Sequence, residues 1–377
     1  MPFADALSEH PIPSHAVGEV VGEVLDKLGP APDLAVLFAG AAHTGAMDDI
    51  VRAVNELLEP TVLVGCTAST VVGRSREVED AGGLSLWAAT GMKADAYTLR
   101  VDGSAIRGFP AADEIPDDAS ALLVIADPFT FPTEELLVGL REQAGINLPV
   151  IGGLASAARG PGGNRLVRDH DVRTDGAVLV VLRAVEIETV VSQGCRPIGD
   201  PMIVTAGEGR VARELAGRPA LERVQEILRG LSPDDLQLAQ RGLHVGLVVD
   251  ESKATFDRGD FLVRTVLGAD SSNGAVAFGE EVEVGATVQL HVRDATSADE
   301  DLRHLMAGRD AHGALVFTCN GRGTQLFGVE DHDAIVVNDA LGSVPIAGMS
   351  CAGEIGPVGG RSHLHGFTAS IALFRHR

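Results

Sequence analysis

The sequence predicts a mixed α/β fold of layered sheets covered by helices, because one strand–helix–strand–loop–strand pattern occurs three times in the same order. The three copies open with apolar runs at residues 34–38, 121–125 and 314–317. Each copy continues to a second apolar run that ends in a glycine-containing loop, at Gly65, Gly152 and Gly348. Each then closes with a third apolar run, and such short runs bounded by glycine are typical of buried strands.

The spacing of glycines supports this division. The distance from the loop glycine to the next glycine is 18 residues in the first and third copies (Gly65 to Gly83 and Gly348 to Gly366) and 24 in the middle copy (Gly152 to Gly176). Only the third copy is rich in Cys, Arg, Glu and His side chains. We therefore expect the first two copies to be scaffold for a site in the third.

Apolar residues at helical spacing predict five helices, over residues 14–28, 46–58, 133–144, 221–243 and 297–306. Ser297, followed three residues later by Glu300, is the expected N-cap of the last of these helices. Further strands are expected at 94–101, 186–192, 243–249, 261–267 and 286–292, with a tight turn at 270–274. The last three strands have short polar links, which favours antiparallel pairing.

The chain of 377 residues is longer than one hydrophobic core usually supports, so we expect two domains, intertwined by the repeats. We place an N-terminal helix in residues 1–30, a first domain in 31–225 and a second in 226–377. The charge of −23 repels nucleic acid and anionic lipid, which argues against both as partners.

Four Cys in a chain of this length do not form a disulfide framework. The first residues lack the basic and apolar regions of a secretion signal, and no apolar run reaches the roughly 20 residues of a membrane span. We therefore expect a cytoplasmic protein without membrane insertion.

Several short motifs, taken in order, resemble those of the FIST family, whose members carry FIST N and FIST C domains. The motifs for the first domain are the loop 38–43, the segment 64–69 and the segment 83–86. Those for the second are Thr318 to Gly323, Pro345 to Gly348, Cys351 to Pro357 and His365 to Thr368. The resemblance covers nearly the whole chain and corresponds to FIST N in 31–225 and FIST C in 226–377.

The resemblance implies an intracellular sensory domain in signal transduction that binds small ligands such as amino acids. It implies no catalytic residues and no cofactor. The two domains fill this chain, unlike multidomain members of the family, so a signal is expected to pass through a partner protein or an oligomer.

The expected ligand site is formed by the glycine-rich loops of the third copy. Arg322, between two glycines, is placed to bind a ligand carboxylate through two parallel hydrogen bonds, and Glu354 to accept an amino group. The alternative is that Arg322 and Glu354 pair with each other and hold two loops together. Asn320, Cys319, Cys351, His365 and, in the first copy, His43 complete the candidate ligand contacts.

Cys319 or Cys351 with His365 suggests a thiol-dependent hydrolase or transferase as an alternative function, although no third residue marks an orienting group. The pattern His363-x-His365 with two Cys also admits a tetrahedral metal site, but the close Cys pairs typical of such sites are missing. Small buried thiols explain the cysteines more simply, so we assign no metal and no catalytic residue. A protein-interaction scaffold is the third functional class.

Overall fold

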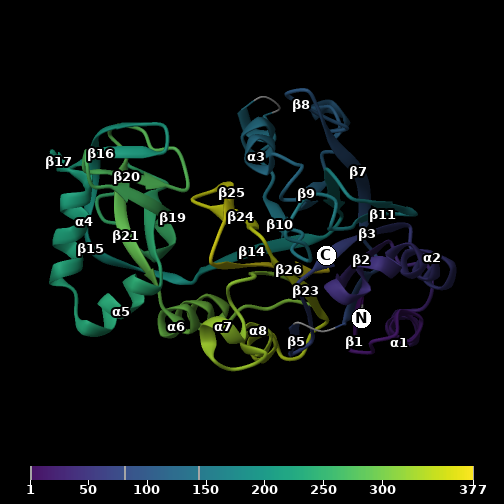
Figure 1. Ribbon diagram of the computed structural model, residues 1–377. Coiled ribbons are helices and arrows are strands. Elements are labelled where there is room, and N and C mark those ends of the chain that lie inside the picture. Colours follow the sequence, from purple (N-terminus) through teal and green to yellow (C-terminus); the bar gives the residue numbers. More distant parts are fainter. Residues whose placement is uncertain (1, 80–81, 143–144, 377) are drawn as a thin grey trace. The chain divides into compact units, whose positions relative to one another are not determined.

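A computed structural model describes residues 2–79, 82–142 and 145–376. The chain forms two compact units (Figure 1). The first contains the residues up to Val191, Leu302–Leu364 and the residues from Thr368 onward, and the second contains Ser192–Asp301 with His365–Phe367. The expected mixed fold with layered sheets and two domains is confirmed.

The first unit contains the three predicted copies. In copy 1, β2 (Leu34–Gly40) leads through α2 (Met47–Leu58) to β3 (Val62–Ala68), and β6 (Leu84–Ala89) closes it. Copy 2 has β9 (Ala119–Ala126), α3 (Thr133–Glu142), β10 (Val150–Leu154) and β13 (Ala177–Arg183), and copy 3 has β22 (Gly313–Cys319), α8 (His332–Leu341), β23 (Ile346–Cys351) and β26 (Thr368–Arg375). In every copy the first two strands are parallel and the third is antiparallel to the first. The repeated unit is therefore confirmed.

One outer strand flanks each copy, and one hairpin follows its second strand. The outer strands are β1 (Phe3–Ser8), β7 (Lys93–Asp102), which also pairs with β8 (Ala105–Arg107), and β14 (Glu186–Gln193). The hairpins are β4 (Thr70–Gly73) with β5 (Arg76–Glu79), β11 (Leu166–Arg168) with β12 (Asp171–Arg173), and β24 (Glu354–Val358) with β25 (Arg361–His365).

Each hairpin pairs with a different copy from the one that produces it. The hairpin of copy 1 extends the sheet of copy 3 beside β23, that of copy 2 extends copy 1 beside β3, and that of copy 3 extends copy 2 beside β10. The exchange is cyclic, so each of the three sheets contains strands from two copies. The repeat pattern did not predict this exchange, because each hairpin pairs with a strand that lies far from it in the sequence.

Gly65, Gly152 and Gly348 lie inside the second strand of their copies and not in the loops expected after it, and each is required by close packing. Gly65, Gly152 and Gly348 lie opposite Leu37, Val124 and Val316 on the neighbouring parallel strand. A Cβ on any of the three would stand 1.9–2.0 Å from the carbonyl oxygen of that partner residue. The second glycine does not repeat in the same way: Thr368, rather than Gly366, occupies the position of Gly83 and Gly176 in the register.

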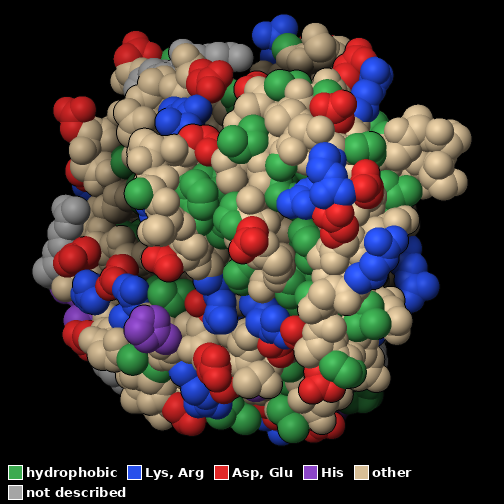
Figure 2. All heavy atoms as spheres, turned by 90° about the vertical axis from the view of Figure 1, so that its left-hand side faces the viewer, with side chains coloured by type: hydrophobic (Ala, Val, Ile, Leu, Met, Phe, Trp, Pro, Cys, Tyr) green, Lys and Arg blue, Asp and Glu red, His purple; other side chains and the backbone are tan. Residues whose placement is uncertain are grey.

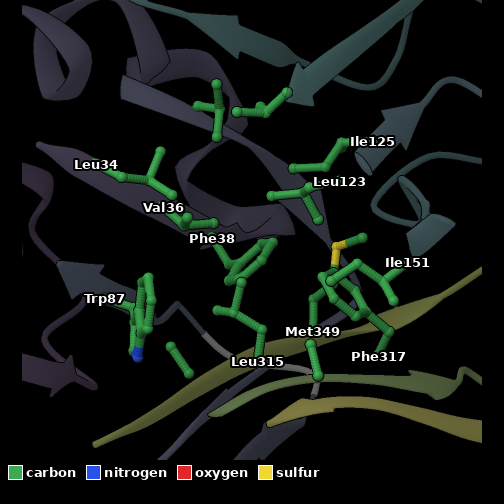
Figure 3. Packing of buried hydrophobic residues seen from close by; sticks show 14 of the residues in the cluster. Leu34, Val36, Phe38, Trp87, Leu123, Ile125, Ile151, Leu315, Phe317 and Met349 are labelled. Carbon is green, nitrogen blue, oxygen red and sulfur yellow. The ribbon is translucent and has the colours of Figure 1, made fainter. Parts of the chain in front are cut away.

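The three sheets share one core, and each packs its other face against helices. Alternate residues of β2 face the two sides: Val36 and Phe38 join the shared core, whereas Leu37 packs with α1 and α2. Figure 3 shows this core, with Leu123 and Ile151 from copy 2 and Phe317 and Met349 from copy 3 converging on Phe38. Trp87 is fully buried in it and stacks on Phe3 at 5.2 Å between ring centroids.

Helices cover the outer faces. α1 (Pro13–Leu28) begins with Pro at its first position and turns Val20 and Val24 inward, as the 3.6-residue spacing predicted. α2 and α3 follow the same pattern, and the last two predicted positions of α3, residues 143 and 144, lie outside the described residues. α6 (Ala295–Met306) and α8 pack on copy 3.

Two helix predictions are wrong in their boundaries. The segment 221–243 forms two helices, α4 (Ala220–Gly230) and α5 (Pro233–Arg241), because Pro233 cannot continue a helix and Ser232 caps the next one by accepting from Asp235 N at 3.1 Å. α6 begins before Ser297. Asp294 is its cap and accepts from Thr296 N and Ser297 Oγ at 3.2 and 2.8 Å.

The second unit is built on antiparallel strands, as predicted. They are β15 (Cys195–Glu208), β16 (Val211–Leu215), β17 (Arg218–Pro219), β18 (Leu243–Val248), β19 (Phe261–Asp270), β20 (Ala275–Phe278) and β21 (Thr287–Arg293). The order β15-β21-β18-β19-β20-β16 returns to β15, so the sheet closes on itself. The long strand β15 was not predicted, because Pro197, Gly199 and Pro201 interrupt its apolar pattern.

Short helical turns complete the chain: η1 (Ala41–Ala46), η2 (Ala112–Glu114), η3 (Arg258–Asp260) and α7 (Thr324–Phe327). On the face drawn in Figure 2, acidic and basic side chains are interspersed and form no extended patch of one sign. Within the described ranges, no helix combines the length and the apolar character that a membrane crossing needs.

Candidate functional site

The reactive residues of copy 3 gather where its two parallel strands end. Cys319 and Cys351 are directly paired at the carboxyl ends of β22 and β23. The next residue, Asn320, donates its backbone N–H to the Cys351 carbonyl at 2.9 Å, and Ala352 donates to Leu154 O of copy 2 at 3.0 Å. Asn320 and Ala352 are exposed, whereas both cysteines are buried. The carboxyl ends of parallel strands are the usual place for ligand-binding loops.

Glu354 lies beneath this surface. It opens β24, pairs with Gly153 of copy 2 in the register and is 0 % exposed. Its Oε2 accepts from the backbone N–H of Thr368 at 3.1 Å and from Thr368 Oγ1 at 2.8 Å. Its Oε1 is also buried, and within the described part of the chain it makes no hydrogen bond of ordinary geometry. An unsatisfied buried oxygen is costly in a folded protein.

Burial raises the pKa of Glu354 to about 8, even though the bonds from Thr368 and the charge of Arg322 lower it. The carboxyl group is therefore mostly protonated at pH 7. Burial, and then the neighbouring Glu354, raise the pKa of the Cys351 thiol well above its usual value. A catalytic thiol needs the opposite shift, so the environment of Cys351 does not suit the thiol-dependent alternative.

Arg322 is paired with a residue that sequence reasoning missed. Its Nε and Nη2 donate to the two carboxylate oxygens of Asp333 at 2.6 and 2.9 Å, and both side chains are 1 % exposed. Although burial alone would raise it, the guanidinium lowers the pKa of Asp333 to about 2. The sequence signal was the run Asp331-His332-Asp333 directly before the apolar residues of α8, which places a carboxylate in the first turn of that helix.

Aromatic rings enclose the Arg322–Asp333 pair. The guanidinium carbon lies 5.2 Å from the centre of the Phe327 ring, and the imidazole of His332 stacks on the same ring at 3.4 Å between centroids. His332 Nδ1 lies 2.9 Å from Asp333 Oδ1. The third guanidinium nitrogen, Nη1, is buried without a hydrogen-bond partner among the described residues. The site therefore holds one unused donor on Arg322 and, on Glu354, a buried acceptor that no strong donor satisfies among the described residues, because its further contact is the Cys319 thiol.

The hairpin that copy 1 contributes anchors the loop after β22. Glu79 accepts from Thr324 N and Thr324 Oγ1 at 2.8 and 3.0 Å, and Glu77 accepts from Ala334 N at 2.9 Å. Gly323 has φ +64°, and a Cβ there would lie 2.5 Å from Glu79 Oε1. Burial, and then the charge of Asp333, raise the pKa of Glu77 to about 7. A movement of this loop would therefore alter its hydrogen bonds to β5.

Ends of strands from all three copies meet beside this site. Ser156, which follows β10, donates from Oγ to Ser350 O at 2.5 Å and accepts from Ser69 N at 3.0 Å. The hydroxyl groups of Ser69 and Ser156 are 3.2 Å apart. Both serines are half-buried and follow the second strand of their copies, a repeated position that could have marked them in the sequence.

Equivalent positions in the three copies carry different chemistry. The register places Glu354 where copies 1 and 2 hold Val71 and Leu166. It also places Cys351 where they hold Ala68 and Ala155, and Thr368 where they hold Gly83 and Gly176. At these three positions, polar and reactive groups replace small or apolar ones only in copy 3.

The remaining predicted residues lie apart from this cluster or add little to it. His43 is fully buried in η1 of copy 1, at the position equivalent to Arg322, and burial lowers its pKa. His365 is buried at the end of β25 and groups with the second unit. Across the described ranges, no group of three or more His, Cys, Asp or Glu is arranged to hold a metal ion.

Comparison with known proteins identifies the family. The FIST N domain matches residues 33–218, and the FIST C domain matches residues 220–357. The chain belongs to the FIST family. FIST domains are sensory domains of signal transduction, and the motifs that suggested them lie in β2, β3, β6 and the whole of the copy 3 site.

Two mycobacterial proteins are similar to this chain over nearly their full length. An uncharacterized protein of Mycobacterium bovis is 46 % identical over 374 residues, which cover 95 % of each chain. An uncharacterized protein of Mycobacterium tuberculosis is 45 % identical over 382 residues, which cover 98 % of each chain. These names assign no ligand, so the chemistry of the site must be argued from its residues.

Proposed function

We propose that this FIST protein is a cytoplasmic sensor that binds a small zwitterion, such as an amino acid, between the glycine-rich loops of copy 3. One observation carries the proposal: Arg322 Nη1 and Glu354 Oε1 are buried and make no hydrogen bond of ordinary geometry within the described residues, and the further contact of the Glu354 carboxyl group is with the thiol of Cys319, a weak donor. A ligand with a carboxylate and an ammonium group supplies both missing partners. The remaining candidate contacts are the exposed Asn320 and the thiol of Cys319.

Glu354 gives the binding a proton signature. Because its pKa is about 8, the group carries a proton at pH 7 and must lose it to pair with an ammonium ion. Binding at pH 7 should therefore release close to one proton. The affinity should rise between pH 6 and pH 8.5, as the carboxyl group ionises before the ligand arrives.

Access to Glu354 requires the chain around it to move, because the carboxyl group is fully buried, and the nearby loops at 320–323 and 352–353 are the segments expected to separate. The first loop is held by Glu79 through Thr324 and by Asp333 through Arg322. A ligand that binds Arg322 therefore changes the contacts that the loop makes with β5 and α8. Such a shift is the kind of change that a partner protein reads in signal transduction.

The test is calorimetric titration of the purified full chain with a panel of amino acids and simple carboxylates. Each titration is run at pH 7 in two buffers with different ionisation enthalpies, which counts released protons. Glu354→Gln should abolish proton release and weaken binding at least tenfold, because the amide cannot become an anion. Asp127→Asn is the matched control, since Asp127 is equally buried but belongs to copy 2.

Binding that releases no proton, or that survives Glu354→Gln unchanged, would contradict the proposed site. No saturable heat with any member of the panel would contradict the proposed ligand class. The thiol-dependent alternative would gain support only from rapid stoichiometric alkylation of one cysteine at pH 7, which the raised pKa of Cys351 opposes.

A further inference from the structure

A hollow of about 440 Å³ lies on the first unit, away from the loops of copy 3. Its walls come from β7, the end of β8 and the β11–β12 hairpin, which lie near one another in Figure 1. Arg100 and Arg107 face each other across the β7–β8 pair, and Arg168 approaches from β11. Tyr97 and Asp171 complete the polar lining.

The three arginines make little use of their hydrogen-bonding capacity. Arg107 Nε is 3.8 Å from Asp102, and Arg168 is 3.8 Å from Asp169 and 4.0 Å from Asp171, all beyond hydrogen-bond distance. Arg168 Nε is buried without a partner, and Arg100 has no ion pair in the part of the chain that the structure describes. Other arginines of this unit are better satisfied: Arg183, for example, bonds to Asp118 at 2.7 Å.

The net charge around the hollow is also opposite in sign to the net charge of the whole chain. Three guanidinium groups and one carboxylate line it, in a protein whose formal charge is −23. An acidic surface gives no reason to gather arginines that form only long ion pairs. Guanidinium groups recognise oxyanions through two parallel hydrogen bonds, and several groups around one hollow select for multiple negative charges.

We propose that this hollow binds a small oxyanion that carries two or more negative charges, through Arg100, Arg107 and Arg168. The backbone conformation at the rim of the hollow also supports a specific site. Gly108, at the rim, has φ +88°, and a Cβ there would stand 2.1 Å from Thr98 O, so only glycine allows the chain to turn beside Arg107. Phosphate and polycarboxylate share the chemistry, and the test separates these two sources. The site is independent of the copy 3 ligand.

The full chain is titrated with inorganic phosphate and, separately, with citrate, at constant ionic strength set with sodium chloride. Calorimetry should give saturable binding of one or both anions. Arg168→Gln and Arg100→Gln should each weaken it about tenfold, and Arg168→Lys should weaken it by nearly as much because the planar fork is lost. Asp171→Asn should strengthen it several-fold by removing the opposing charge.

Arg213→Gln is the control, because Arg213 is about as exposed as Arg107 (66 % against 68 %) and is similarly loosely paired. Binding of phosphate alone assigns the hollow to phosphorylated compounds, and binding of citrate alone to polycarboxylates. No binding of either anion would overturn the proposal. An equal loss in Arg213→Gln would overturn it as well, since it would show a non-specific charge effect.

Discussion

Copies 1 and 2 of the repeat differ from copy 3 in chemistry but not in backbone. All three have the same strand directions and the same glycine packed against a neighbouring carbonyl oxygen. At the inward-facing hairpin position, however, copies 1 and 2 hold Val71 and Leu166, whereas copy 3 holds Glu354. The first two copies show what the fold requires at this position. Because an apolar side chain is sufficient there, the buried carboxyl group of copy 3 requires another explanation.

The difference between Glu354 and its apolar counterparts shows that the buried carboxyl group lowers stability without being needed for the fold. A buried carboxyl group whose pKa is raised to about 8 destabilises the folded protein at neutral and higher pH. Strain and poorly satisfied polar groups of this kind concentrate at functional sites. The same reasoning does not apply to Arg322, whose charge is matched by Asp333. Each of the following predictions tests one part of this comparison.

The largest expected effect concerns what the copies share. Gly65→Ala, Gly152→Ala and Gly348→Ala should each lower the free energy of unfolding by more than about 4 kcal/mol, or abolish soluble folding, because the added methyl group meets a backbone carbonyl oxygen. Urea denaturation and the soluble yield measure this loss. Gly18→Ala, in open space on α1, should instead be neutral or stabilise by about 0.5–1 kcal/mol. A tolerated substitution in one copy alone would show that the copies are not equivalent.

The second prediction concerns the buried ion pair of copy 3. Arg322→Ala should cost about 3–5 kcal/mol, because it leaves the Asp333 carboxylate buried and unpaired. The double variant Arg322→Met with Asp333→Leu should recover most of that loss in urea denaturation. Arg183→Ala, which breaks the exposed pairs with Asp118 and Asp95, should cost far less, because solvent screens such pairs. If the double variant is no better than the single one, the pair has a role beyond charge compensation.

The smallest effect is a dependence on pH. The folded protein keeps the Glu354 proton up to about pH 8, whereas the unfolded chain loses it near pH 4.5, so stability from this group falls as the pH rises between these values. Glu354→Gln removes this fall. Its melting temperature should match that of the unmodified protein at pH 4 and exceed it by a few degrees at pH 8.5.

Glu77→Gln sharpens the measurement. The pKa of Glu77 is about 7, so the gain in that variant should level off at a lower pH than in Glu354→Gln. A gain that does not change with pH would mean that the pKa of Glu354 is not raised in the folded protein.

Much of the fold could be predicted because the relevant signals are local. Apolar spacing located α1, α2 and the strands of all three copies, and the order of the runs revealed the repeat. The site was predicted less completely. Sequence reasoning considered Glu354 as the structural partner of Arg322, but the Arg322 side chain turns toward α8 and pairs with Asp333. Neither that direction nor the meeting of Ser69 with Ser156 follows from periodicity, because both depend on how the copies pack.

The cyclic exchange of hairpins has a consequence for synthesis on the ribosome. Val71 pairs with Met349, 278 positions later in the chain (349 − 71), so the edge of β4 that does not pair with β5 has no partner strand until nearly all of the protein has emerged. Contacts this distant slow folding and leave sheet edges and apolar faces open to wrong pairing. No single copy, and no fragment that ends before Ile346, can complete the first unit. The hairpin of copy 1 can therefore reach its native pairing only after the strands of copy 3 have been synthesised.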